Sequence, residues 1–232
     1  MNAHNTPSPR SPSASRPSRA SGRGYAVKEC FLTLQGEGVQ SGSRAVFLRF
    51  AGCNLWSGRE EDRASAQCTF CDTDFVGTDG DGGGKFARAE ELAAHVESLW
   101  GEDFERRLVV ITGGEPMLQL DSGLIDALHA RRFRIAVESN GTLEATPGID
   151  WLCISPKAGT DVVQRRGDEL KLVWPQDGID PAELEEWQFD HFLVQPMDCL
   201  ARDEAVAAAI RLAMERPKSR LSLQTHKVVG LS

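Results

Sequence analysis

Short apolar segments, each followed at once by polar or small residues, recur along most of the chain. Residues 108–111 are followed by Thr112-Gly113-Gly114-Glu115-Pro116, and residues 151–154 by Ser155-Pro156-Lys157. Segments with helical periodicity separate several of them, and strands that alternate with helices form parallel sheets with right-handed crossovers. The polar clusters are therefore expected to meet at the carboxyl edge of one sheet and to build a site there.

The apolar periodicity predicts strands over residues 27–34, 45–50, 108–111, 134–137, 151–154, 170–174, 192–194 and 221–223, and helices over residues 87–100, 118–131, 181–187 and 201–216. Residues 139–150 and 156–168 are too short and too rich in Gly and Pro for full crossover helices. The predicted fold class is α/β, a partial (β/α)6-type barrel of mostly parallel strands with some crossover helices missing. Residues 78–85 are rich in Gly and Asp but lack the Walker spacing, which predicts a flexible loop.

Length and composition indicate one domain over residues 25–232 behind a Ser/Pro/Arg-rich extension, residues 1–24, that is expected to be disordered and is not a secretory signal. No segment is apolar for long enough to span a bilayer. The net charge is −8, and the extension carries four arginines and no acid, so the remainder carries −12. This acidity argues against direct nucleic-acid binding. Six cysteines are few for a secreted disulfide scaffold, which favours a reducing cytoplasm and a metal site.

Three of the six cysteines, Cys53, Cys68 and Cys71, follow the second predicted strand with the spacing C-x14-C-x2-C. A structural zinc site would need a fourth ligand, and no other Cys or His stands beside the three at metal-ligand spacing. Three thiolates fit an iron–sulfur cluster with one iron free of protein ligands. The cysteines alone leave both interpretations open. The remaining cysteines, Cys30, Cys153 and Cys199, are expected to be buried thiols.

Three further features are candidates for a site. Gln35-Gly36-Glu37-Gly38 is either a plain turn or a turn that faces a ligand. The glycines before Glu115 would let the backbone approach a ligand, whereas Glu115-Pro116 could simply begin a helix. Arg49 lies inside an apolar strand, which favours pairing with a substrate carboxylate over a surface salt bridge.

The cysteines together with Gly-Gly-Glu-Pro resemble the radical S-adenosylmethionine enzymes. The departure is the first cysteine spacing, which is three residues in that superfamily and fourteen here, an insert that can loop out at little cost. The resemblance is closer to the 7-carboxy-7-deazaguanine synthase family, and it runs from about Tyr25 to Ser232. It is carried by these segments: Gln35-Gly36-Glu37-Gly38, Arg49-Phe50-Ala51-Gly52-Cys53, Cys71-Asp72-Thr73, Glu138-Ser139-Asn140-Gly141, Ser155-Pro156-Lys157, Gln195-Pro196-Met197-Asp198 and Gln224-Thr225-His226-Lys227.

The resemblance implies a carbon–nitrogen lyase that converts 6-carboxy-5,6,7,8-tetrahydropterin to 7-carboxy-7-deazaguanine with loss of ammonia, in the biosynthesis of queuosine and related 7-deazapurines. It implies a 4Fe-4S cluster, S-adenosylmethionine and magnesium as cofactors, a homodimer, and an electron donor such as flavodoxin. Two alternatives remain at this point. One is a glycyl-radical activase of the same superfamily, and the other is a zinc-binding adaptor without catalysis.

The resemblance also assigns roles to individual residues. Cys53, Cys68 and Cys71 would bind the cluster, Thr73 magnesium, and Glu138 and His226 would be catalytic. The expected substrate-binding residues are Leu34, Gln35, Gly36, Glu37, Arg49, Thr112 and Ser232, the last through the terminal carboxylate. The expected S-adenosylmethionine-binding residues are Gly114, Glu115, Ser139, Ser155, Pro156, Lys157, Gln195, Pro196, Met197 and Asp198.

Overall fold

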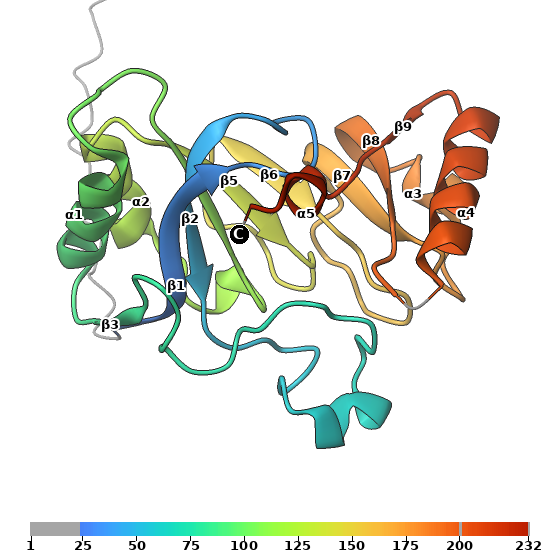
Figure 1. Cartoon of the computed structure of the whole chain (residues 1–232), viewed down its shortest axis with the longest axis horizontal. Helices are drawn as coiled ribbons and strands as arrows, with labels where there is room; N and C mark the ends of the chain where they lie inside the picture. The colour runs from blue at the N-terminus through green and yellow to red at the C-terminus, as the bar shows by residue number, and fades with distance from the viewer. Residues whose placement is uncertain (1–23, 200, 232) are drawn as a thin grey trace, which may run out of the picture.

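The computed structural model describes residues 24–199 and 201–231, and these form one nine-stranded sheet with the order β3-β1-β2-β4-β5-β6-β7-β8-β9 (Figure 1). The strands are β1 (Tyr25–Leu34), β2 (Arg44–Phe50), β3 (Gly84–Phe86), β4 (Leu108–Gly113), β5 (Arg134–Ser139), β6 (Trp151–Ile154), β7 (Arg166–Trp174), β8 (Gln188–Pro196) and β9 (Ser219–Leu221). The helices are α1 (Ala89–Trp100), α2 (Ser122–Ala130), α3 (Pro181–Leu184), α4 (Arg202–Glu215), α5 (Thr225–Val229) and the 3-10 turns η1 (Glu60–Ser65) and η2 (Pro116–Leu118). The predicted extension lies outside the described residues except for Gly24.

The sheet is parallel from β2 to β9 and is antiparallel only where β1 meets β2 and β3. It stays open, with β3 and β9 at its edges. Residues 140–150 and 155–165, all of them described, hold no helix. This confirms the predicted partial barrel with crossover helices missing on both sides of β6.

The central strands are buried on both faces, as expected for a parallel sheet. In β4, Val109 and Ile111 belong to the main core, while Leu108 and Val110 belong to a smaller apolar cluster. Helix α1 adds Leu92 to the main core. The alternation of side chains along β4 therefore joins two cores through one strand.

Several element boundaries differ from the sequence prediction. Helix α2 begins at Ser122, because Asp121 accepts a hydrogen bond from the Leu124 amide at 3.0 Å and caps it, and the preceding residues form η2. Strands β7 and β8 begin four residues before the predicted starts, and β9 lies two residues before its predicted position. No helix among the described residues has the length and apolar character needed to cross a membrane.

The Gly- and Asp-rich segment at residues 78–85 was predicted to be a loop, but it leads into the edge strand β3. Cys30 donates its amide proton to the Asp81 carbonyl at 2.7 Å, and Gly80 donates to the Lys28 carbonyl at 2.9 Å. The segment is thus held along β1 by backbone hydrogen bonds. No local apolar pattern marks such a strand, because only pairing with β1 defines it.

Candidate active site

A cavity of about 400 Å³ lies at the carboxyl ends of the parallel strands, a size suited to a small-molecule ligand. Loops after β1, β2, β4, β5, β6 and β8 contribute to its wall, and helix α5 closes one side. The predicted site residues in its lining are Leu34, Gln35, Gly36, Glu37, Arg49, Cys68, Cys71, Thr73, Thr112, Gly114, Glu138, Ser139, Ser155, Lys157, Gln195, Pro196, Met197, Asp198 and His226. The sheet topology therefore gathers segments that are far apart in the sequence around one space.

The cysteine loop, defined as residues 51–74 after β2, packs closely against the end of β4. Glu115 donates its amide proton to the Gly52 carbonyl at 3.0 Å, and a Cβ built on Gly114 would lie 2.5 Å from Cβ of Cys53. A side chain at residue 114 would consequently displace the backbone that carries Cys53. The glycine is needed for this approach of two loops, in addition to any approach of a ligand.

The three candidate cluster ligands influence one another electrostatically. A hydrogen bond from Cys68 lowers the pKa of Cys71 to about 6, while the same bond and burial raise the pKa of Cys68. Burial raises the pKa of Cys53, and repulsion by Cys71 adds to the increase. Cys71 therefore ionises more readily than Cys68 or Cys53.

The donor set fits an iron–sulfur cluster better than a single ion. Among residues 24–199 and 201–231, no three His, Cys, Asp or Glu side chains are placed to hold one metal ion together. A cubane spreads its irons over several ångströms, so three thiolates bound to different irons need not converge on a point. Cys68 and Cys71 also border the cavity, which would place an open iron next to bound ligands.

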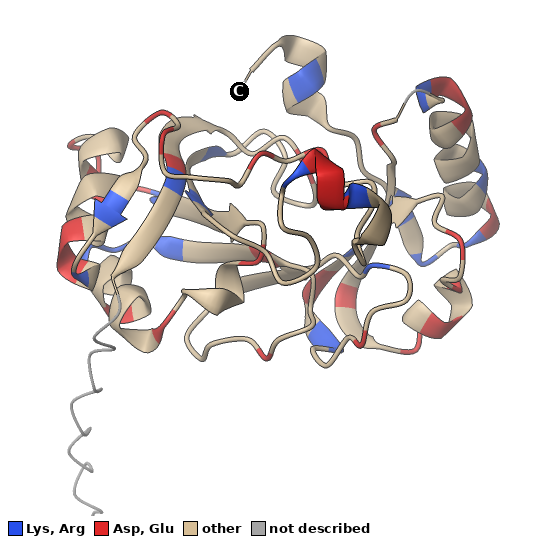
Figure 2. Ribbon diagram, turned by 90° about the horizontal axis from the view of Figure 1, so that it is seen from below, with Lys and Arg blue, Asp and Glu red and all other residues tan. Residues whose placement is uncertain are grey.

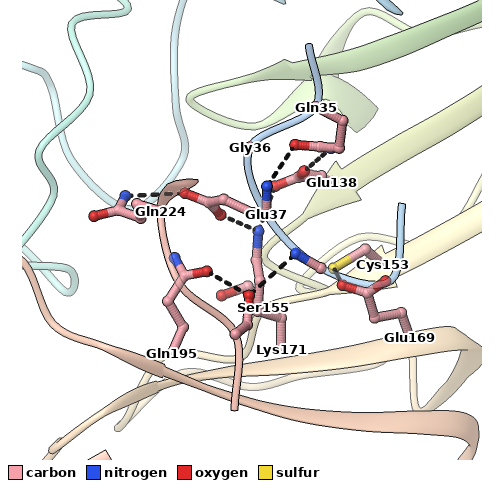
Figure 3. A network of polar contacts seen from close by, with 12 residues as sticks. Gln35, Gly36, Glu37, Glu138, Cys153, Ser155, Glu169, Lys171, Gln195 and Gln224 are labelled. Carbon is pink, nitrogen blue, oxygen red and sulfur yellow. Dashed lines mark hydrogen bonds and ion pairs between the residues drawn. The ribbon is translucent and has the colours of Figure 1, made fainter. Parts of the chain in front are cut away.

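A charged network built on Glu37, Glu138 and Lys171 lines the same cavity (Figure 3). The Lys171 ammonium forms ion pairs with Glu37 and with Glu138, the latter at 2.7 Å. Gln35 donates to Oε1 of Glu138 at 2.9 Å, and Gln224 donates to Oε1 of Glu37 at 2.9 Å. Two carboxylates are thereby fixed within reach of one cation.

Arg49 lies at the cavity wall and already has a partner there. Its Nε donates to Oε1 of Glu29 at 2.6 Å, because Glu29 and Arg49 are opposite each other in the antiparallel register of β1 and β2. The sequence left a choice between a salt bridge and a ligand contact. The structure shows the salt bridge, and since it uses Nε, the terminal Nη atoms can still approach a ligand carboxylate.

Glu115 has a different environment from the one expected of a ligand-binding carboxylate. Its side chain is fully buried and accepts hydrogen bonds from the amides of Met117 and Asn140 and from the hydroxyl of Ser139, at 2.8–2.9 Å. Burial raises its pKa. In this structure the carboxylate joins the end of β4 to the loop after β5, and it does not line the cavity.

The C-terminal helix α5 is attached to the turn after β1. Thr225 donates its amide proton to the Gly36 carbonyl at 2.9 Å, and the His226 ring lies directly over Gly36, where a Cβ would collide with it. Lys227 pairs with Asp72 at 2.7 Å and with Asp198 at 2.6 Å. The helix thus joins the predicted magnesium loop to the loop after β8. Ser232 lies outside the described residues.

Comparison with known proteins gives consistent matches. Residues 63–169 match the family model of the radical SAM superfamily. The chain is 60% identical over 207 residues to a 7-carboxy-7-deazaguanine synthase of Caulobacter vibrioides and 58% identical to that of Bordetella pertussis, in each case across 89% of this chain and 99% of the relative. The chain belongs to the 7-carboxy-7-deazaguanine synthase family. The crystal structure of QueE from Escherichia coli superposes with a TM-score of 0.65 at 28% identity, over 88% of this chain and 95% of that one.

Most residues that the resemblance to the 7-carboxy-7-deazaguanine synthase family assigned to ligands do reach the cavity, and their individual roles stay predictions. Cys53, Glu115 and Pro156 are outside its lining, although Cys53 adjoins Gly114. Sequence reasoning missed Lys171, yet a lysine inside the apolar strand Leu-Lys-Leu-Val-Trp is the same signal that drew attention to Arg49. Cys199 was expected to be buried and is exposed, because it lies in the loop between β8 and α4.

Proposed function

We propose that the chain is a 7-carboxy-7-deazaguanine synthase, a radical S-adenosylmethionine lyase that converts 6-carboxy-5,6,7,8-tetrahydropterin to 7-carboxy-7-deazaguanine and releases ammonia. The observation that carries the proposal is the placement of the cysteine loop and the paired carboxylates Glu37 and Glu138 on one cavity. A radical enzyme needs its cofactor and its substrate in contact inside a shielded space, and both groups of residues border this one cavity.

In this proposal Cys53, Cys68 and Cys71 hold a 4Fe-4S cluster and leave one iron free for S-adenosylmethionine. When bound, the reduced cluster supplies the electron for reductive cleavage of that cofactor. Residues at the carboxyl ends of β4, β5, β6 and β8 line the same cavity and are assigned to the adenosine and methionine parts. They are Gly114, Ser139, Ser155, Lys157, Gln195, Pro196, Met197 and Asp198.

The substrate has two ends that this chain can recognise separately. The Nη atoms of Arg49 would bind its carboxylate, and Glu37 and Glu138 would accept hydrogen bonds from its amino and amide groups. Burial lowers the pKa of the Lys157 ammonium, which donates to the carbonyl and the hydroxyl of Ser155 at 2.8 and 2.7 Å. His226, beside the turn after β1, is the candidate for moving a proton.

The remaining assignments are also proposals. Thr73, with Asp72 next to it, would coordinate magnesium together with the substrate and water, since magnesium prefers oxygen ligands and retains several waters. We further propose a homodimer in the cytoplasm, an electron donor such as flavodoxin, and a product that feeds queuosine or related 7-deazapurines. The acidic chain, at a net charge of −8, supports a small-molecule substrate over direct binding of tRNA.

One anaerobic assay tests the proposal. The purified chain is reconstituted with iron and sulfide, reduced, and supplied with S-adenosylmethionine, magnesium and 6-carboxytetrahydropterin. We expect 7-carboxy-7-deazaguanine by mass, and its loss in Cys68→Ala. Formation of 5′-deoxyadenosine without this product would overturn the substrate but not the radical chemistry. Zinc without bound iron, and no cofactor cleavage, would overturn both.

A further inference from the structure

We infer that Lys171 is a positioning residue that holds Glu37 and Glu138 side by side as a paired acceptor for the N–H groups of the pterin ring. The inference deepens the proposed function and rests on it. It assigns a task to a residue that does not itself need to touch the reacting atoms. It also states which chemical feature of the ligand the site selects, namely two adjacent hydrogen-bond donors.

The position of Lys171 in the sheet makes this arrangement possible. Glu138 on β5, Cys153 on β6 and Glu169 on β7 are paired across the parallel register, so their side chains share one face of the sheet. Lys171 lies two residues beyond Glu169 and therefore on that same face. Its ammonium reaches past β6 to Glu138 and also meets Glu37, which comes from the turn after β1.

Each carboxylate is held through both of its oxygens. In Glu37, Oε2 pairs with Lys171 and Oε1 accepts from Gln224; in Glu138, Oε2 pairs with Lys171 and Oε1 accepts from Gln35 (Figure 3). A carboxylate oxygen has a second lone pair, so it can accept one more hydrogen bond without giving up the first. The two groups are therefore oriented before a ligand arrives.

The ammonium also decides the charge state of the pair. The Lys171 side chain is only 4% exposed, and it is shared by two carboxylates. Burial by itself would raise the pKa of Glu37, but attraction by Lys171 and the hydrogen bonds from Gln224 and Gln195 lower it to about 2. The attraction of the two carboxylates in turn raises the pKa of Lys171, against the effect of burial. Glu37 is thus an acceptor throughout the neutral range.

Without the Lys171 ammonium, Glu37 and Glu138 would have a different charge state. Two carboxylates that face each other in a partly buried site cannot both ionise easily, and one proton is then shared between them with a raised apparent pKa. Other ionisable groups also lie close to Glu37, Glu138 and Lys171. They are Asp72 from the cysteine loop, Cys153 from β6, Lys157 from the loop after β6, Glu169 from β7 and His226 from α5. None of them makes an ion pair with Glu37 or Glu138 among the described residues.

The ligand edge that fits two fixed acceptors is an amino group beside a ring N–H, as in the 2-amino-4-oxo pyrimidine half of a pterin. A lumazine carries a carbonyl in place of the amino group and would direct an acceptor at a carboxylate. Sites built to hydrogen-bond a donor reject an analogue that lacks it by large factors, because their buried polar groups remain unpaired. We expect 6-carboxypterin to bind at least about a hundredfold more tightly than 6-carboxylumazine.

The test measures equilibrium binding of 6-carboxypterin to the reconstituted full chain between about pH 5.5 and about pH 7.5, a range that brackets ordinary histidine but not carboxyl titration. Wild type and Lys171→Arg, which keeps the charge, should show equal affinity at all pH values. In Lys171→Met the dissociation constant should rise about tenfold per pH unit as the pH falls below the raised pKa. In turnover the same variant should show the change in KM more than in kcat.

A double variant guards against loss of folding in Lys171→Met. The double variant Glu37→Gln/Lys171→Met keeps only the Glu138 carboxylate, so no proton is shared between two carboxylates. It should bind 6-carboxypterin weakly and with an affinity that does not change with pH. It should also discriminate less against 6-carboxylumazine. A flat pH profile in Lys171→Met, or undiminished discrimination in the double variant, would overturn the inference and leave the proposed function intact. Absence of 6-carboxypterin binding to wild type would overturn the proposed substrate and the inference with it.

Discussion

Arg63 provides a direct test of how the chain holds its cysteine loop. It lies in η1, within the fourteen-residue insert between Cys53 and Cys68, which projects from the body of the fold (Figure 1; the acidic turn is red in Figure 2). Its Nη1 donates to the carbonyls of Thr69 at 2.9 Å and Cys71 at 3.1 Å. The perturbation is Arg63→Met, which keeps the aliphatic stem and removes every donor.

The contacts of Arg63 set the size of the effect. Two hydrogen bonds from a charged donor contribute about 1.5 kcal/mol each at the lower end of their range, which is appropriate because the side chain is 29% exposed. The guanidinium also lies 4.1 Å from the centre of the Trp56 ring, a contact that adds about 0.5 kcal/mol. The ion pair with the exposed Glu60 contributes little. The loss is about 3.5 kcal/mol, or roughly a 400-fold increase in local opening.

Hydrogen exchange followed by mass spectrometry measures this opening. Peptides that contain Gln67, whose amide donates to the Leu55 carbonyl at 3.0 Å, should exchange about 400 times faster in Arg63→Met. Iron and sulfide retained per chain after reconstitution should fall as well. The matched control is Arg59→Met in the same insert, since that side chain is 72% exposed and its ion pair with Glu61 spans 3.9 Å. Equal exchange in the two variants would refute the reasoning.

Three other predictions follow from the same structure. Gly114→Ala should lower the iron content after reconstitution, because its methyl group would meet Cβ of Cys53 at 2.5 Å. The control Gly123→Ala in α2, where nothing lies nearer than 3.4 Å, should instead raise the free energy of unfolding by about 0.5–1 kcal/mol. Equal iron content in wild type and Gly114→Ala would contradict the prediction. The pKa of Glu37 is lowered to about 2, so its carboxylate stabilises the fold above the ordinary carboxyl pKa of about 4.3, and this stabilisation is lost as the pH falls toward 2. In urea titrations, the difference in unfolding free energy between wild type and Glu37→Gln should therefore shrink as the pH falls over that range. A constant difference would refute the assignment. Arg107→Leu should destabilise the chain by about 3 kcal/mol in the same titrations, because its buried guanidinium pairs with Glu97 at 2.7 Å and donates to three backbone carbonyls; a loss below about 1 kcal/mol would mean that those carbonyls find water instead.

Features that depend on neighbouring residues could be predicted before the fold was known. Apolar periodicity located the central strands and the missing crossover helices around β6, because burial on both faces of a parallel strand leaves a continuous apolar run. The cysteine spacing and the Gly-Gly-Glu-Pro segment indicated the superfamily for a similar reason, since a cluster loop and a strand end are local structures. Element boundaries were less certain where a cap such as Asp121, and not periodicity, set the start of a helix.

The partners of the polar side chains could not be predicted from the sequence, because they depend on how the strands and loops are arranged in space. Arg49 pairs with Glu29 because the register of β1 and β2 places them opposite each other, and no local pattern states that register. Lys171 meets Glu37 and Glu138 across 134 and 33 residues of sequence. The physical reason is that a hydrogen bond or ion pair needs contact within about 3–4 Å, and strand order and loop path alone bring such distant groups that close.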